Sequence, residues 1–178
     1  SLTQNKFKSK VIDITYVTVS DEGHAVEMKN ALEGICKEAD KAINDGFNII
    51  ILSDRATSSG RLAIPALLAC SSTHQFLVKS GNRTNAGLVI DTGSAREVHH
   101  FALLAGYGAE AICPWLTYET IKTLSDDFIK AQENYIKAIG KGLFKVMSKM
   151  GISTYQSYCG AQVFEAIGLN KNFIEKYF

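Results

Sequence analysis

The sequence predicts an α/β fold: a partial or irregular (β/α) TIM-barrel-like domain, or an open twisted sheet, with about five parallel strands. Short apolar segments alternate with longer segments of helical periodicity, and polar loops follow the apolar segments. Strands that alternate with helices pair in parallel through right-handed crossovers. A closed eight-stranded barrel needs roughly 250 residues, so a chain of 178 residues predicts only part of one.

Five short apolar runs predict the strands. Each is bounded by polar residues or by glycine, and the central ones lack a polar face, as expected for strands buried on both sides. We predict strands over residues 11–19, 47–52, 88–90, 109–113 and 152–158.

Helices are predicted where apolar residues recur every 3.6 positions or where helix-starting residues stand. Pro65 lies in a first turn, where its missing N–H costs no hydrogen bond, and Gly46, Gly81 and Gly151 end helices. The longest helix carries a lysine stripe that we interpret as a solvent-exposed face. We predict helices over residues 25–45, 65–79, 94–106, 114–124 and 125–149, with a short closing helix that opens at Gly160.

The segment 88–108, LVIDTGSAREVHHFALLAGYG, contains a complete strand, turn and helix. A Thr-Gly pair ends the apolar run, and Ser94 follows. Glu97, three residues on, completes an S-x-x-E capping box in which each side chain accepts a hydrogen bond from an unpaired backbone N–H. The pattern therefore predicts that this helix begins at Ser94.

Composition and charge exclude several functional classes. The 19 basic and 18 acidic residues produce no bulk field that would attract nucleic acid. No apolar run approaches the ~20 residues that span a bilayer, and the polar start SLTQNKFKSK lacks the apolar core of a signal peptide. We therefore expect a soluble, cytoplasmic protein that binds neither nucleic acid nor membrane.

Polar residues at the carboxyl ends of the predicted strands are the candidates for a site, because ligands bind there in this class of fold. Asp54 beside Arg55 orients an anionic substrate in one interpretation and braces its own loop in the other. His99 and His100 point about 100° apart on a helix, so no metal site is predicted. The candidates for a strand-end or interface role are the polar loop residues 20–22 and Asp54, Arg55, Arg96, His99, His100, Tyr158 and Gln162.

No residue is assigned a catalytic, cofactor-binding or metal-binding role. The chain has no G-x-S-x-G elbow, no Walker-type loop and no G-x-G-x-x-G after a strand. The four cysteines are far apart and form no C-x-x-C pair, so reduced, buried thiols are expected.

Several blocks, in order, resemble the central domain of glutamate synthase. They are ILSDR at 51–55, IPALLA at 64–69, GSAREVHHFALLAGYGAEA at 93–111 and YIKAIGKGLFKVMSKMGISTYQSYCGAQVFEAIGL at 135–169. Together they cover most of the chain from about Asn48 onward. The segment CSSTHQF at 70–76 and the loop 56–63 depart from the family pattern, which puts any role of His74 in doubt.

The resemblance implies a place in a long polypeptide. In that family a glutamine amidotransferase domain, the central domain, an FMN-binding barrel with a 3Fe-4S cluster and a β-helix are joined. Ammonia released from glutamine passes through a tunnel to 2-oxoglutarate at the flavin, where glutamate forms. Residues 1–178 are then expected to be one domain, the C-terminal portion of the central domain. The resemblance also implies that it links the amidotransferase and FMN-barrel domains, helps shape the ammonia channel, holds no cofactor and is inactive alone.

Two other interpretations stay open at this point. One is a freestanding flavin-dependent or aldolase-like barrel enzyme that uses Asp54, Arg55 and Tyr158 at the strand ends. The other is an interaction module in which Trp115, Tyr118 and the aromatic residues at the C-terminal end dock a neighbouring domain.

Overall fold

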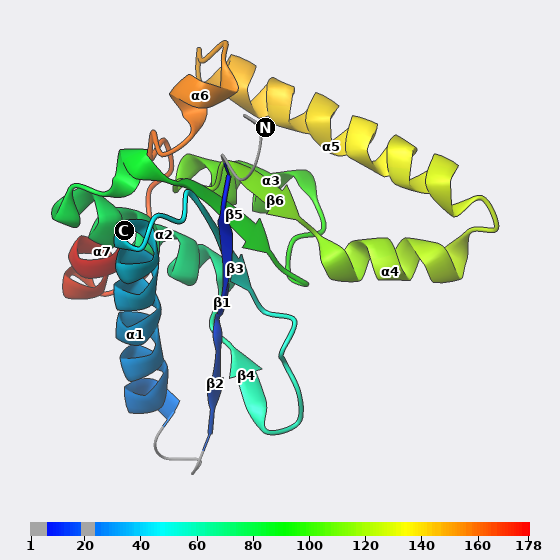
Figure 1. Ribbon diagram of the computed structural model, residues 1–178. Helices are drawn as coiled ribbons and strands as arrows, with labels where there is room; N and C mark the ends of the chain where they lie inside the picture. Colours follow the sequence, from blue (N-terminus) through cyan, green and yellow to red (C-terminus); the bar gives the residue numbers. More distant parts are fainter. Residues whose placement is uncertain (1–6, 19–23) are drawn as a thin grey trace, which may run out of the picture.

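A four-stranded parallel sheet forms the centre of the computed structural model, which describes residues 7–18 and 24–178 (Figure 1). The sheet contains β1 (Ser9–Asp13), β3 (Ile49–Ser53), β5 (Gly87–Asp91) and β6 (Ala111–Cys113), in that order. The order along the sheet follows the order along the chain without a reversal. The sheet is therefore wound in one direction, as in a β/α barrel, and has no switch point of the doubly wound kind.

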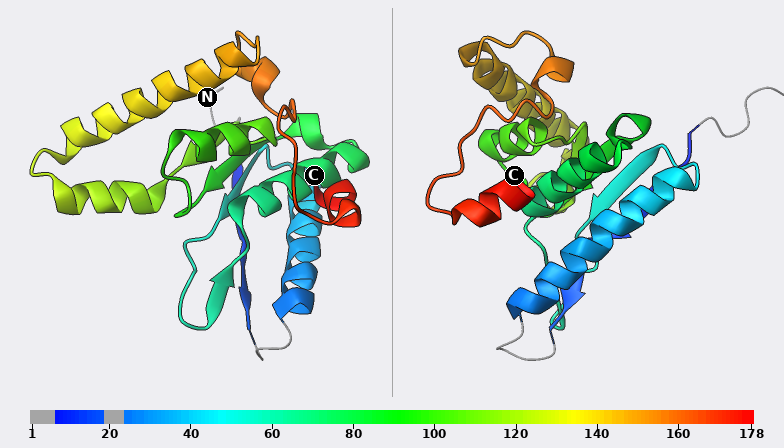
Figure 2. Two further views of the ribbon diagram at one scale, coloured as in Figure 1. Left: turned by 180° about the vertical axis from the view of Figure 1, so that it is seen from behind. Right: turned by 90° about the vertical axis from the view of Figure 1, so that its left-hand side faces the viewer.

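One layer of helices covers one face of the sheet (Figures 1 and 2). It consists of α1 (His24–Asn44), α2 (Ala66–Ser80) and α3 (Val98–Gly106). Alternate strand residues point into this layer and are fully buried, and each such side chain contributes about 1.5–3 kcal/mol of burial free energy. These strand residues are Ile12, Ile50, Leu52, Leu88 and Ile90.

The other face of the sheet is apolar but incompletely covered. Val11 is 58% exposed, while Ile49, Ile51 and Val89 are half-buried. None of the four belongs to the buried core clusters formed by the described residues. Strands in β/α folds are normally buried on both faces. This face is as apolar as a buried surface, but no layer of the described residues covers it fully.

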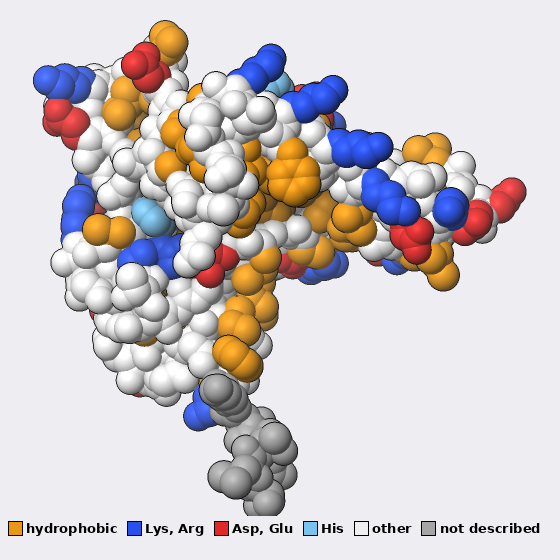
Figure 3. All heavy atoms as spheres, turned by 90° about the horizontal axis from the view of Figure 1, so that it is seen from above, with side chains coloured by type: hydrophobic (Ala, Val, Ile, Leu, Met, Phe, Trp, Pro, Cys, Tyr) orange, Lys and Arg blue, Asp and Glu red, His pale blue; other side chains and the backbone are white. Residues whose placement is uncertain are grey.

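An arm of two helices projects from the body beyond β6 (Figure 1). It consists of α4 (Trp115–Leu124) and α5 (Phe128–Lys149), and only Met147 of these residues is buried. The predicted lysine face of α5 is confirmed as exposed. Hydrophobic side chains gather between the arm and the body in Figure 3. Within the described ranges, no helix is both long and apolar enough to cross a bilayer.

The predicted fifth strand over 152–158 is wrong. Residues in this segment form α6 (Tyr155–Tyr158), because Thr154 caps the turn and accepts a hydrogen bond from the Ser157 N–H. The two tyrosine hydroxyls donate to backbone carbonyl groups of Ala109 and Ala102 instead of lining a strand end. The parallel sheet therefore has four strands.

The closing helix begins later than predicted. Gly160 has a φ of 73°, in the left-handed region, and the chain runs irregularly to α7 (Lys171–Tyr177). Asn170 caps this helix by accepting from the Asn172 N–H.

The first predicted strand is divided, and a small hairpin sheet was missed. After β1, a separate β2 (Thr15–Val17) pairs antiparallel with β4 (Arg61–Ala63), which lies at the end of the predicted loop 53–61 and beyond. The Arg61 guanidinium holds this pair to the end of β1, at 2.6 Å from Asp13 Oδ2 and 2.9 Å from Thr15 Oγ1. Residues 19–23, which include the predicted end of the strand and the polar loop 20–22, lie outside the described residues.

The helix predicted from Ser94 begins four residues later, at Val98. The Ser94 hydroxyl lies 2.9 Å from Thr92 Oγ1 and so takes part in the preceding turn. Instead, His100 Nδ1 accepts hydrogen bonds from the N–H groups of Arg96 (3.1 Å) and Glu97 (3.4 Å). The capping box is thus shifted by three residues: Glu97 is the N-cap residue in place of Ser94, and His100 takes the role predicted for Glu97. A short 3-10 helix, η1 (Arg83–Asn85), precedes β5.

Candidate functional site

The carboxyl ends of β3, β5 and β6 bring the predicted Asp54–Arg55 pair next to polar residues of the following strands. The strands are in register there, with Ser53 opposite Asp91 and Asp91 opposite Cys113. The Asp54 N–H donates to the Asp91 carbonyl at 3.1 Å, which fixes the two strand ends relative to each other.

Asp54 is a buried carboxylate, with 6% of its surface exposed. It accepts hydrogen bonds from the Thr92 hydroxyl at 2.5 Å, from the Gly93 N–H at 3.0 Å and from the Trp115 indole N–H at 2.6 Å. A buried carboxylate is stable only with such donors. The arrangement joins the ends of β3 and β5 to the start of α4 and is that of a loop brace.

Arg55 forms an ion pair with Asp91. The guanidinium approaches the carboxylate with two nitrogens, at 2.7 and 3.1 Å, and lies 5.2 Å from the centre of the Trp115 ring. The Ser53 hydroxyl donates to the same carboxylate at 2.8 Å. Burial raises the pKa of Asp91, but the hydrogen bonds from Arg55 and Ser53 outweigh burial and hold this pKa below its ordinary value.

The strand-end edge does not fit the phosphate group of FMN. A phosphate at such an edge accepts hydrogen bonds from free backbone N–H groups. Here the N–H of Thr92 donates to Cys113, that of Gly93 to Asp54, and that of Ser94 to the Thr92 hydroxyl. All three N–H groups are therefore already paired within the chain, and the carboxylates at this edge would repel a phosphate.

The cysteines do not fit an iron–sulfur cluster, which needs several thiolates directed at one point. Cys36 and Cys70 are buried, and burial raises the pKa of the Cys36 thiol to about 11. Burial also raises the pKa of Cys113 and of Cys159. Among the described residues, no three His, Cys, Asp or Glu side chains gather into a metal site.

The other predicted candidates lie elsewhere, and no hydrogen bond or ion pair in the described part of the chain joins them to Asp54 or Arg55. Arg96, His99 and His100 stand at the start of α3, where the Arg96 carbonyl accepts from the Tyr135 hydroxyl of α5 at 2.9 Å. Tyr158 is fully buried in α6. Gln162 has a φ of 52°, and its side-chain amide donates to the carbonyl of Phe178 at 2.6 Å.

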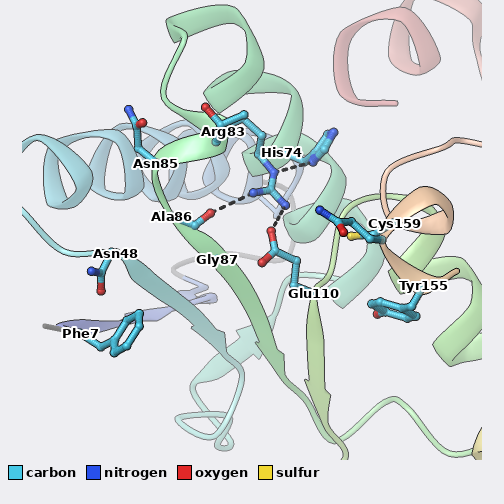
Figure 4. Close-up of a pocket in the computed structure, with 12 residues that line it drawn as sticks. Phe7, Asn48, His74, Arg83, Asn85, Ala86, Gly87, Glu110, Tyr155 and Cys159 are labelled. Carbon is cyan, nitrogen blue, oxygen red and sulfur yellow. Dashed lines mark hydrogen bonds and ion pairs between the residues drawn. The ribbon is translucent and has the colours of Figure 1, made fainter.

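A cavity of about 810 Å³, which the sequence reasoning missed, lies at the opposite edge of the sheet (Figure 4). Arg83 dominates it. Its guanidinium donates to His74 Nδ1 at 2.8 Å, to the carbonyls of Ala86 and Gly108 at 2.9 Å each, and to Glu110 Oε1 at 2.8 Å. Nearly all the donors of Arg83 are therefore used within the protein, and the cluster ties α2 to the amino ends of β5 and β6.

His74 should make stability depend on pH. Burial, and then the charge of Arg83, lowers its pKa from 6.5 to about 4. Between these values the unfolded chain binds the proton and the folded chain does not, so the free energy of unfolding should fall as the pH falls from 6.5 toward 4. In His74→Asn, whose Oδ1 can still accept from Arg83, urea denaturation across this range should show a smaller slope against pH. Equal slopes in the two proteins would show that His74 does not titrate in this way.

The comparisons with known proteins give the family. A family model of the glutamate synthase central domain matches residues 1–170. The chain is 43% identical over 177 residues to the large chain of NADPH glutamate synthase from Bacillus subtilis, covering 96% of this chain and 11% of that protein. It is 44% identical over 180 residues to NADH glutamate synthase from Schizosaccharomyces pombe, covering 97% of this chain and 8% of that protein.

A plant enzyme is also similar to this chain. The chain is 40% identical over 195 residues to a chloroplastic ferredoxin-dependent glutamate synthase from Oryza sativa, covering 99% of this chain and 12% of that protein. The chain thus spans about a tenth of the length of these relatives. Because the rice enzyme is chloroplastic, the expected cytoplasmic location stays a prediction.

Among solved structures, a mutant flavocytochrome b2 with benzoylformate matches 80% of this chain and 38% of its own, with a TM-score of 0.54 and 13% identity. Such a likeness shows the fold alone, and it agrees with a partial β/α barrel. Together with the matched family model and the relatives above 40% identity, the resemblance of the sequence blocks is confirmed. The chain belongs to the glutamate synthase central-domain family.

Proposed function

We propose that this chain is a non-catalytic domain that links the amidotransferase and FMN-barrel domains of a glutamate synthase. The observation that carries the proposal is the closed strand-end edge. Where β/α enzymes bind substrates, the carboxylates of Asp54 and Asp91 are saturated by hydrogen bonds from this chain's own residues. Among the described residues, this edge offers neither an activated nucleophile nor a free anion-binding group.

The link to other domains is supported by the size of the relatives and by the open sheet face. The chain corresponds to 8–12% of each glutamate synthase described above, in keeping with one domain of a larger polypeptide. FMN and the 3Fe-4S cluster then belong to other parts of that polypeptide, since the residues here fit neither group. The uncovered apolar face and the projecting arm are the surfaces available to neighbouring domains.

The open face also supports a contribution to an ammonia channel. Its half-buried side chains are aliphatic, as at Ile51 and Val89. An apolar wall disfavours the charged ammonium ion, since a buried charge without partners is costly. The same wall is compatible with the passage of neutral ammonia.

The inactivity of the isolated chain can be tested directly. We expect the purified 178-residue chain, supplied with glutamine, 2-oxoglutarate, FMN and a reductant, to release no glutamate above the protein-free background. Titration into FMN should leave flavin fluorescence unquenched. Turnover of glutamine, or saturable quenching of FMN, would contradict the proposal and favour the flavin-dependent barrel enzyme.

A further inference from the structure

The outer edge of β1 has no strand beside it among the described residues (Figure 1). β1 pairs with β3 on its other side, where the Lys8 carbonyl accepts a hydrogen bond at 3.1 Å and the Ile14 N–H donates one at 2.9 Å. Because the backbone direction alternates along a strand, the odd-numbered residues between them point away from β3. The N–H and C=O groups of Ser9, Val11 and Asp13 therefore face outward, without a partner among the described residues.

β1 lacks the features that usually protect an exposed edge from pairing. Such edges are typically blocked by proline or by a charge that would be left unpaired in a longer sheet. β1 contains no proline. Its two charged side chains are paired within the chain, because Lys10 lies 3.1 Å from Glu38 and Asp13 lies 2.6 Å from Arg61. The edge is therefore able to accept a further strand.

The side chains of β1 define the chemistry of a segment that would lie beside it. Val11 lies on the uncovered apolar face of the sheet, next to Ile49 and Ile51 of β3. Lys10 lies on the opposite face, where its partner Glu38 belongs to α1. Successive residues of a strand point to opposite faces. A segment that fits this edge therefore alternates apolar residues, on the side of Val11, with polar residues on the side of Lys10.

We propose that the outer edge of β1 binds an extended segment of the same synthase polypeptide, which adds a further strand to the four-stranded sheet. Another extended chain presents N–H and C=O groups at the spacing of the unpaired groups of β1. The relatives are about ten times longer than this chain, so the segment comes from outside residues 1–178. The added strand continues the uncovered apolar face. The proposal rests on the linking role, which makes the segment part of the same polypeptide.

Hydrogen exchange at two neighbouring amides tests the pairing. The Val11 N–H points away from β3, whereas the Ile12 N–H, on the same strand, points toward it and serves as the matched control. In the 178-residue chain we expect rapid exchange at Val11 and slow exchange at Ile12. In the complete synthase, exchange at Val11 should slow at least about 100-fold, because a paired amide exchanges only when its ladder opens. Ile12 should be protected in both proteins.

The outcomes that contradict the proposal are distinct from those that contradict the linking role. If the Val11 amide exchanges equally fast in both proteins, no strand is added. The linking role survives that result if the Val11→Cys side chain becomes covered in the complete polypeptide. If the Val11 amide is already protected in the 178-residue chain, the chain itself occupies the edge, or a second copy does where protection rises with protein concentration. Either result would overturn the proposal.

Two variants at Val11 separate strand pairing from simple burial. Val11→Pro removes the outward N–H, whereas Val11→Thr keeps it. Proline is tolerated on an edge whose N–H faces solvent, so both variants of the 178-residue chain should unfold at similar urea concentrations. In the complete polypeptide, Val11→Pro should restore fast exchange at the outward amides of Ser9 and Asp13, while Val11→Thr should leave them protected. Equal protection in the two variants would show that no paired strand protects this edge.

Discussion

Replacing Asp54 by alanine is expected to lower the free energy of unfolding by about 4 kcal/mol. The reason is the number of donors that would lose their acceptor in a closed environment. The indole of Trp115, the hydroxyl of Thr92 and the N–H of Gly93 all donate to this carboxylate. Urea denaturation measures the loss, and the emission of Trp115, the only tryptophan, reports on the site itself.

Matched variants distinguish the loss of the Asp54 hydrogen bonds from the effect on stability of removing any acidic side chain. Asp126→Ala, at an exposed position, should change stability by less than about 0.5 kcal/mol. Asp54→Asn keeps one oxygen acceptor, so its loss of stability should lie between those of Asp54→Ala and Asp126→Ala. If Asp54→Ala behaves like Asp126→Ala and leaves the tryptophan emission unchanged, Asp54 does not hold the strand ends together.

Gly142→Ala is expected to cost about 2–3 kcal/mol by overpacking the contact between α3 and α5. A Cβ at this position would overlap the side chain of Val98, which fixes the distance between the two helices. At Gly140, two residues earlier on the same helix, a Cβ would meet no atom within 4 Å. Gly140→Ala should therefore stabilise the chain by up to about 1 kcal/mol, the gain from a better helix former.

A double-mutant cycle identifies the cause. Val98→Ala removes the methyl groups that the new Cβ would meet, so Gly142→Ala should cost much less in that background than in the wild type. Equal costs in both backgrounds would place the origin of the effect elsewhere. A stabilising effect of Gly142→Ala like that of Gly140→Ala would show that the helices do not approach closely at Val98.

The sequence located the elements whose signals are local. The apolar runs at 47–52 and 109–113 lie within two residues of β3 and β6, and Gly46 and Gly81 end helices in the left-handed region, with φ of 88° and 79°. The prediction of a strand over 152–158 was wrong because contacts with residues distant in the sequence determine the conformation of this segment. The hydroxyls of Tyr155 and Tyr158 bond to backbone carbonyls about fifty residues away in the chain, which no strand pattern reveals.

The candidate site was predictable only in part, for the same reason. Asp54 and Arg55 are adjacent in sequence and follow an apolar run, so their position at the strand ends could be predicted. Their partners could not, since Asp91 and Trp115 lie 36 and 61 residues further along the chain. The cluster of His74, Arg83 and Glu110 lies at the amino ends of the strands, where no sequence signal directed attention.

The most direct test of a linking domain is whether the open sheet face becomes covered in the complete synthase. Val11, 58% exposed here, marks that face, and Val11→Cys can be labelled with a maleimide in both the 178-residue chain and the complete polypeptide, with the native cysteines as background. Lys137→Cys, on the exposed face of α5, serves as the control. We expect the labelling rate of Val11→Cys, relative to this control, to fall at least tenfold in the complete polypeptide. An equal relative rate in both proteins would contradict the proposed linking role.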